Sequence, residues 1–325
     1  MAEAQSNLTP QPPSLRGKGE SDDEPAARHS SPAPPSLLGK GAGGLGVLST
    51  FRASDGYPFY YRRFAPPGVP AARLVFVHGI RSHGGWYEKS CRAFAAAGFE
   101  VYFLDRRGSG LNTARRGDAP TFRRLIDDVA EFVTHLREER AWLPVVVGGI
   151  SWGGKLAVGL TYRHPGLIDG LVLLCPGLVP KVAPPLAGRV RIAVALVFRP
   201  WKFFPVPLNE PELFTASPAG RAFVAAEPHG LRLATARFLF ASFSIDVYLR
   251  RAVRGVTVPT LLVLAEHDRI IDNAQTREVV ARFGTPATVV EYPGAHHTLE
   301  FEPPGHPWVG DVTTWIETHV VGKCV

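Results

Sequence analysis

The stretch from Val145 to Ala157 constrains the fold more than any other part of the chain. It reads Val-Val-Val-Gly-Gly-Ile-Ser-Trp-Gly-Gly-Lys-Leu-Ala. Three consecutive valines predict a strand buried on both faces, as in a parallel sheet. Gly149 to Gly153 forms a G-x-S-x-G pattern, which is typical of a strained turn from a strand into a helix. We therefore expect Ser151 to have a positive φ and to present its hydroxyl in a cleft, next to the N–H groups of a helix start.

Strands and helices are expected to alternate along most of the chain. The other predicted strands are residues 47–53, 58–65, 73–77, 100–104, 171–174, 260–264 and 288–291. The other predicted helices are residues 88–97, 122–140, 274–283 and 307–320. The first two strands should form a hairpin, and the alternation that follows predicts an α/β fold with a mostly parallel sheet flanked by helices.

Two segments depart from this alternation. Residues 176–249 are expected to be mostly helical, with breaks at Pro200, Pro205 and Pro207. An insertion there would lie above the carboxyl ends of the strands, where open α/β sheets bind ligands. We therefore expect residues 176–249 to form a helical cap, or lid, over a core made of residues 47–175 and 250–322. Residues 1–46 are rich in Pro, Gly and Ser and are predicted to be a disordered tail.

The composition of the chain limits the classes of function to be considered. The chain has 325 residues, a net charge of +7 and 45% hydrophobic residues, which suits a globular enzyme with a sizeable core. Its basic residues form no stripe interleaved with aromatic residues and match no nucleic-acid-binding motif, so nucleic acid is not an expected partner. The chain contains no H-E-x-x-H motif, and no metal or other cofactor is expected.

Cysteine usage and hydropathy indicate the compartment. The three cysteines, Cys91, Cys175 and Cys324, form no C-x-x-C pair and no even framework, so they are interpreted as reduced thiols. The amino terminus has no basic-then-apolar signal pattern, and no apolar run approaches the ~18 residues of a membrane span. These features predict a cytoplasmic protein.

A serine nucleophile needs a base and an orienting carboxylate, and both candidates follow Ser151 in the order typical of this strand–turn–helix arrangement. Asp268 is the favoured acid because it comes directly after the strand at 260–264. Glu266 and Asp272 are its rivals. Asp272 is better explained as a capping residue for the helix at 274–283.

Two adjacent histidines could act as the base. His296 and His297 both lie in the loop after the final strand, where the third member of such a triad belongs. The residues alone leave the choice between them open.

An oxyanion hole needs two backbone N–H donors. The expected donors are Trp152, which follows the nucleophile, and Ile80, in the loop after the strand at 73–77. The side chain of His78 is expected to have a structural role in packing that turn.

Together these motifs resemble α/β-hydrolases of the monoacylglycerol lipase and lysophospholipase group, near the serine aminopeptidase-like (S33) hydrolases. The resemblance covers about residues 47–320 and rests on His78-Gly79, Asp105-x-x-Gly108-x-Gly110, Gly149-Ile150-Ser151-Trp152-Gly153-Gly154, Asp268, and Gly294-Ala295-His296-His297-x-Leu299-x-x-Glu302. The group's pattern of a histidine followed five residues later by Glu selects His297 over His296. The resemblance implies an α/β-hydrolase fold, and a cap that selects the acyl chain.

One departure keeps a peptidase alternative open. A tryptophan after the nucleophile, as at Trp152, is similar to proline iminopeptidases, where the lipases commonly carry Leu or Met. Those peptidases carry a His-Gly-Gly-Pro-Gly loop at the oxyanion position, whereas this chain reads His-Gly-Ile-Arg-Ser from His78 to Ser82.

The first part of the expected cap combines basic and apolar residues. Residues 176–209 contain five basic and no acidic residues, namely Lys181, Arg189, Arg191, Arg199 and Lys202. An apolar helical face carries Val190, Val194, Val197 and Phe198. This pattern fits peripheral contact with a lipid surface. The favoured alternative is an ordinary cap helix that buries this face against the core.

The prediction for function is a serine hydrolase that cleaves carboxylic esters through an acyl-enzyme, with Ser151, Asp268 and His297 as the catalytic triad. The expected substrate is a small, lipid-like monoester such as a monoacylglycerol or a lysophospholipid. An aminopeptidase-like amidase is one alternative, and an acidic patch in the cap would favour it. The other alternative, from a different class, is a catalytically silent binding module.

Overall fold

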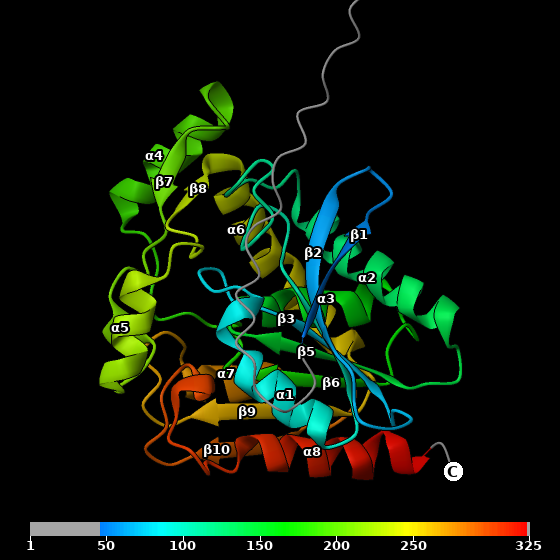
Figure 1. Ribbon diagram of the computed structural model, residues 1–325. Helices are drawn as coiled ribbons and strands as arrows, with labels where there is room; N and C mark the ends of the chain where they lie inside the picture. The colour runs from blue at the N-terminus through cyan, green and yellow to red at the C-terminus, as the bar shows by residue number, and fades with distance from the viewer. Residues whose placement is uncertain (1–45, 324–325) are drawn as a thin grey trace, which may run out of the picture. The chain divides into compact units, whose positions relative to one another are not determined.

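The computed structural model describes residues 46–323, so nearly all of the expected tail at 1–46, and Cys324, lie outside the described residues. The main sheet has eight strands in the order β1-β2-β4-β3-β5-β6-β9-β10 (Figure 1). Their bounds are β1 (Val47–Arg52), β2 (Pro58–Phe64), β3 (Arg73–Val77), β4 (Glu100–Leu104), β5 (Val145–Ile150), β6 (Gly170–Leu174), β9 (Thr260–Ala265) and β10 (Thr288–Tyr292). Pairing is antiparallel between β1, β2 and β4 and parallel between all other neighbours, so the predicted mostly parallel sheet is confirmed.

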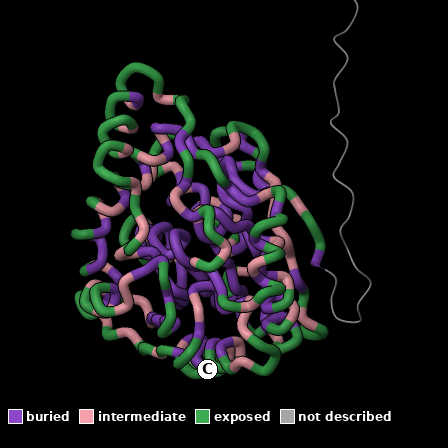
Figure 2. The backbone as a smooth tube through the Cα atoms, turned by 90° about the vertical axis from the view of Figure 1, so that its left-hand side faces the viewer, coloured by how far each residue is buried: buried purple, intermediate pink, exposed green. Residues whose placement is uncertain are grey.

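Helices cover both faces of this sheet. On one face α1 (Glu88–Ala96) packs against α8 (Trp308–His319), and on the other α2 (Phe122–Glu139) packs against α3 (Gly153–Arg163) (Figure 1). α7 (Asn273–Val280) follows β9. Strands β3, β4, β5, β6 and β9 are buried along their whole length, as their apolar sequences require. In Figure 2 the buried residues run through the middle of the folded part, and exposed residues gather around them.

Helices are the largest elements of the segment 176–249. It contains α4 (Leu186–Phe198), α5 (Pro218–Ala226) and most of α6 (Ala236–Ala252). It also contains a small antiparallel sheet of β7 (Phe203–Pro205) and β8 (Leu233–Thr235) that the sequence does not predict, because three-residue strands are too short to show a periodicity. α6 continues past residue 249 and packs against α2 and α3 as well as α4, so the boundary between cap and core stays a prediction.

One expectation about the cap is wrong. The apolar face of α4 is not buried: Val190 and Val194 are each 55% exposed, Val197 is 73% exposed and Phe198 is 78% exposed. α4 packs against α6 through its other side, where Ala195 is buried. The apolar pattern at residues 190–198 therefore does not result from burial of this face against the core.

Single-turn 3-10 helices complete the described chain. They are η1 (Gly84–Trp86), η2 (Pro211–Leu213), η3 (Val253–Gly255), η4 (Leu299–Phe301) and η5 (Val321–Lys323). Within residues 46–323, none of the helices combines the length and the hydropathy that crossing a membrane requires.

Candidate active site

Ser151 lies at the turn between β5 and α3, as the sequence predicts. Its φ is 51°, a left-handed value that is unusual for a residue with a side chain. The flanking glycines allow this turn: a Cβ on Gly149 would lie 2.6 Å from the Gly154 Cα, and one on Gly153 would collide with the Val77 carbonyl oxygen. The turn therefore presents Ser151 at the carboxyl edge of the sheet at the cost of backbone strain.

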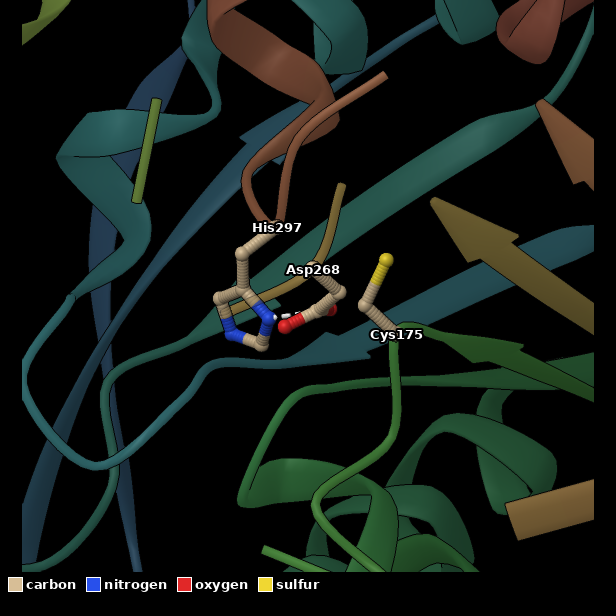
Figure 3. A group of neighbouring side chains, drawn as sticks. All are labelled: Cys175, Asp268 and His297. Carbon is tan, nitrogen blue, oxygen red and sulfur yellow. Dashed lines mark hydrogen bonds and ion pairs between the residues drawn. The ribbon is translucent and has the colours of Figure 1, made fainter. Parts of the chain in front are cut away.

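The structure brings Ser151, His297 and Asp268 into one hydrogen-bonded chain. His297 Nε2 lies 2.9 Å from Ser151 Oγ, and His297 Nδ1 lies 2.6 Å from Asp268 Oδ2. Figure 3 shows the imidazole of His297 facing the carboxylate of Asp268. The three residues follow β5, β9 and β10, whose carboxyl ends meet at the same edge of the sheet. This is the geometry that a nucleophile, a base and an orienting acid require.

The surroundings of Asp268 keep it ionised. Burial alone would raise the pKa of Asp268, but the attraction and hydrogen bond of His297 and the N–H groups of Ile271 and Ile270 outweigh burial and lower it. The rival acids lie elsewhere. Asp272 caps α7 by accepting from the Gln275 N–H, as expected, and Glu266 accepts from the Gly294 N–H.

The second histidine has other contacts. His296 Nδ1 lies 3.3 Å from Glu302, whose carboxylate also accepts from the His296 N–H. Of the adjacent pair, the structure thus places His297 beside Ser151 and His296 on Glu302. The glutamate five residues after His297 contacts the neighbouring histidine rather than His297 itself.

The loop expected to complete an oxyanion hole lies directly against Ser151. A Cβ on Gly79 would lie 3.1 Å from the Ser151 Cβ, and Ile80 lines the same cavity as Ser151. Neither the Ile80 N–H nor the Trp152 N–H donates to an acceptor among residues 46–323, so both are free for a ligand. His78 is fully buried and its Nε2 accepts from the Arg106 N–H, which supports the structural role expected for its side chain.

Comparison with known proteins identifies the family. The family model described as serine aminopeptidase, S33, matches residues 68–304, which is more than half of the chain. The chain belongs to this family.

Curated relatives include the monoacylglycerol lipase of Mycolicibacterium smegmatis, 28% identical over 278 residues that cover 83% of this chain and 97% of that protein. The human monoglyceride lipase is 27% identical over 263 residues, covering 77% of this chain and 83% of its own. A solved structure of a monoglyceride lipase from Saccharomyces cerevisiae, in complex with a substrate analogue, superposes with a TM-score of 0.75 at 17% identity, covering 89% of this chain and 99% of that one. These similarities extend over the core and the cap segment together.

A cavity of about 550 Å³ opens between the S33-family core and the cap segment, and Ser151 lies in its wall. Most of its lining is apolar and comes from α4, α6 and the loops between, including Ile192, Leu196, Val206, Leu208, Leu239 and Phe243. The polar exceptions include Lys155, whose ammonium lies 2.5 Å from Asp246 across the α3–α6 contact. The cavity therefore suits an apolar chain attached to a group that reacts at Ser151.

Cys175 is a neighbour of the site that sequence reasoning missed. Its side chain lies beside Asp268 (Figure 3), and its sulfur and single ligand atoms of Asp268 and His297 all lie within 4.8 Å of one another. Burial raises the pKa of the Cys175 thiol well above its usual value, so the thiol stays protonated at neutral pH. Cys175 comes directly after β6, at the edge of the sheet where such folds bind ligands, and this position could have identified it from the sequence.

Proposed function

We propose that this chain is a serine hydrolase that cleaves carboxylic esters of lipid-like substrates, such as monoacylglycerols or lysophospholipids. The observation that carries the proposal is the hydrogen-bonded chain of Ser151, His297 and Asp268 in the wall of a largely apolar cavity. The names of the M. smegmatis and human relatives support the same substrate class.

In the proposed mechanism the Ser151 hydroxyl attacks the ester carbonyl while His297 accepts its proton. Asp268 holds the imidazole in the correct tautomer and stabilises the cation that forms. The N–H groups of Ile80 and Trp152 donate to the oxyanion of the tetrahedral intermediate. His297 then protonates the leaving alcohol, and water, activated by His297 in turn, releases the acid from the acyl-enzyme.

An ester preference over a free-amine peptide substrate follows from the charges in the cavity. An aminopeptidase needs a carboxylate that is free to bind the substrate ammonium. Among the described residues that line the cavity, the acidic side chain is Asp246, which is already paired with Lys155. Lys155 therefore competes with a substrate amine for the carboxylate that the cavity offers.

The decisive experiment measures hydrolysis of 1-monoacylglycerols from short to long acyl chains, with Ser151→Ala as the blank. We expect turnover that depends on Ser151, with an optimum at medium or long chains because the cavity is apolar. Ser151→Ala should lose about 10⁴-fold or more in kcat and keep the wild-type unfolding temperature.

Wild-type activity in Ser151→Ala would contradict the mechanism. If Ser151 reacts with a fluorophosphonate but no ester is cleaved, the substrate class is wrong, and peptide amides are the next substrates to test. If Ser151 fails to react at all, the chain is a binding module rather than an enzyme.

The apolar face of α4 further supports a proposal that the cap contacts lipid surfaces. Val197 and Phe198 are exposed next to Arg199 and Lys202, a combination suited to anionic lipid interfaces. Sedimentation with anionic vesicles should decrease in the double substitution Val197→Ser and Phe198→Ser, while hydrolysis of a water-soluble short-chain ester stays unchanged. Equal sedimentation of both proteins would contradict the contact. A cytoplasmic location is also proposed, in keeping with the cysteine pattern, and cell fractionation tests it.

A further inference from the structure

Arg106 is a buried cation with unusual partners. It lies in the loop after β4 and is 2% exposed. The described residues include no carboxylate within ion-pair distance of its guanidinium, although its neighbour Arg107 is paired with both Asp55 and Asp128. Burial lowers the pKa of Arg106 to about 9, so the side chain is still a cation at neutral pH. The Asp105 carboxylate attracts this cation without forming an ion pair with it, so the buried charge needs further compensation.

That compensation comes from the backbone behind the predicted oxyanion hole. Arg106 Nη2 donates to the Gly79 carbonyl oxygen at 2.8 Å and to the Ile80 carbonyl oxygen at 3.0 Å, and Nε donates to the His78 carbonyl oxygen at 3.2 Å. One guanidinium therefore holds three successive carbonyl groups of the loop that lies against Ser151. The guanidinium also lies over the Trp152 ring, with 4.7 Å from its carbon to the ring centroid.

The hydrogen bond to Gly79 has a specific electronic consequence. The Gly79 carbonyl and the Ile80 N–H belong to the same planar peptide group, and in a trans peptide they point in opposite directions. A cation on the carbonyl side therefore directs the N–H away from itself and polarises it. Hydrogen bonds strengthen one another in this manner when they act on the same chain of dipoles in a low-dielectric interior.

We propose that Arg106 is a positioning residue that orients and polarises the oxyanion hole from behind, through the Gly79–Ile80 peptide group and the Trp152 side chain. It touches neither the substrate nor the reacting atoms. Its guanidinium fixes both donor-bearing segments, and its positive charge stabilises the oxyanion as it forms. This inference rests on the proposed function of the same site.

The test compares Arg106→Met and Arg106→Lys with a matched control, Arg107→Lys, in the full-length chain. The first measurement is the second-order rate of Ser151 labelling by a fluorophosphonate, whose phosphoryl oxygen occupies the oxyanion hole during attack. We expect Arg106→Met to label about 10- to 100-fold more slowly, somewhat less than the loss on removing a direct oxyanion donor. Arg106→Lys keeps the charge but not the fork that holds three carbonyls, so it should lie between Arg106→Met and the wild type.

A second measurement distinguishes an effect of Arg106 on the oxyanion hole from a purely structural role of this residue. A trifluoromethyl ketone forms an oxyanion with Ser151, whereas a monoalkyl glycerol ether binds without one. If Arg106 acts on the oxyanion hole, both variants should lose kcat and ketone affinity by a similar factor and keep KM and ether affinity within about threefold of wild type. Equal losses for ketone and ether, matching those of Arg107→Lys, would overturn the proposal.

Unchanged labelling in Arg106→Met would also overturn it, and if that variant does not fold, the same comparison in Arg106→Lys decides. Failure of the proposed function has a different signature. In that case the wild type would be labelled but would cleave no ester, and the labelling rates of the variants would still decide the role of Arg106.

Discussion

Two regions border the cavity and differ in how deeply they are buried. We call the triad and the strands that precede it the floor, and α4 the roof. At the floor, Ser151, Asp268 and His297 each follow a strand of one sheet, and all three are almost completely buried. At the roof, α4 buries Ala195 but leaves five large apolar residues more than half exposed, namely Leu186, Val190, Val194, Val197 and Phe198. A site that needs atoms placed within tenths of an ångström is carried by buried strands and the loops that follow them. The helix α4, which lines the apolar part of the cavity, packs against α6 on one side and leaves its other side exposed.

The largest expected effect distinguishes two aspartates that are four residues apart in the sequence, Asp268 in the triad and Asp272 at the start of α7. Asp268→Asn should lower kcat by about 10⁴-fold, because an amide can hold His297 in the wrong tautomer and cannot stabilise its cation. Asp272→Asn should keep kcat within about twofold, because asparagine also caps a helix well. Steady-state kinetics on one ester decides. Equal losses in both variants would mean that this loop acts as a structural unit and that the role proposed for Asp268 is wrong.

A smaller effect is expected on the free energy of unfolding when leucine is replaced by alanine in the core and in α4. Leu262 in β9 is completely buried, so Leu262→Ala should lower the free energy of unfolding by about 2–5 kcal/mol. Leu186 in α4 is 77% exposed, so Leu186→Ala should change it by less than about 0.5 kcal/mol. Chemical denaturation of both variants gives the comparison. A cost above about 1 kcal/mol for Leu186→Ala would show that the outer face of α4 is covered in solution.

The smallest effect is a dependence of stability on pH that comes from Glu300 in the core. Burial raises the pKa of Glu300, which accepts from the Ser90 N–H, to about 7 from a reference value of 4.5. The folded chain therefore binds a proton that the unfolded chain releases, and stability falls as pH rises from about 4.5 to about 7.

Glu300→Gln removes this proton equilibrium. Relative to wild type, the variant should gain up to about 3 kcal/mol between pH 5 and pH 8. The control is Glu212→Gln on the exposed side of the cap segment, which should change stability by less than about 0.5 kcal/mol at either pH. Denaturation at the two pH values measures both. A constant difference between Glu300→Gln and wild type would contradict a raised Glu300 pKa.

Much of the core follows from local sequence because its signals are local. Buried parallel strands show as runs such as Val145–Val147, and the turn at Ser151 needs glycines at fixed offsets, so strand positions and the turn can be predicted without knowing their neighbours. The environment of α4 is harder to predict from the sequence. The apolar stripe of α4 has the period of a buried helix, and periodicity does not say whether the partner is the core of the same molecule or a surface outside it.

The sequence by itself determined the order of strands and helices, the strained serine turn, and the short set of acids and histidines that could serve it. The pattern shared with the lipase group already selected His297 over His296 as the base. Only the tertiary structure decided that His296 faces Glu302, that Cys175 lies beside Asp268, and that Arg106 holds the loop at Ile80. The reason is physical. A turn or a strand is fixed by interactions within a few residues, whereas a hydrogen bond between residues 146 positions apart, as between Ser151 and His297, exists only after the strands that carry them have packed side by side.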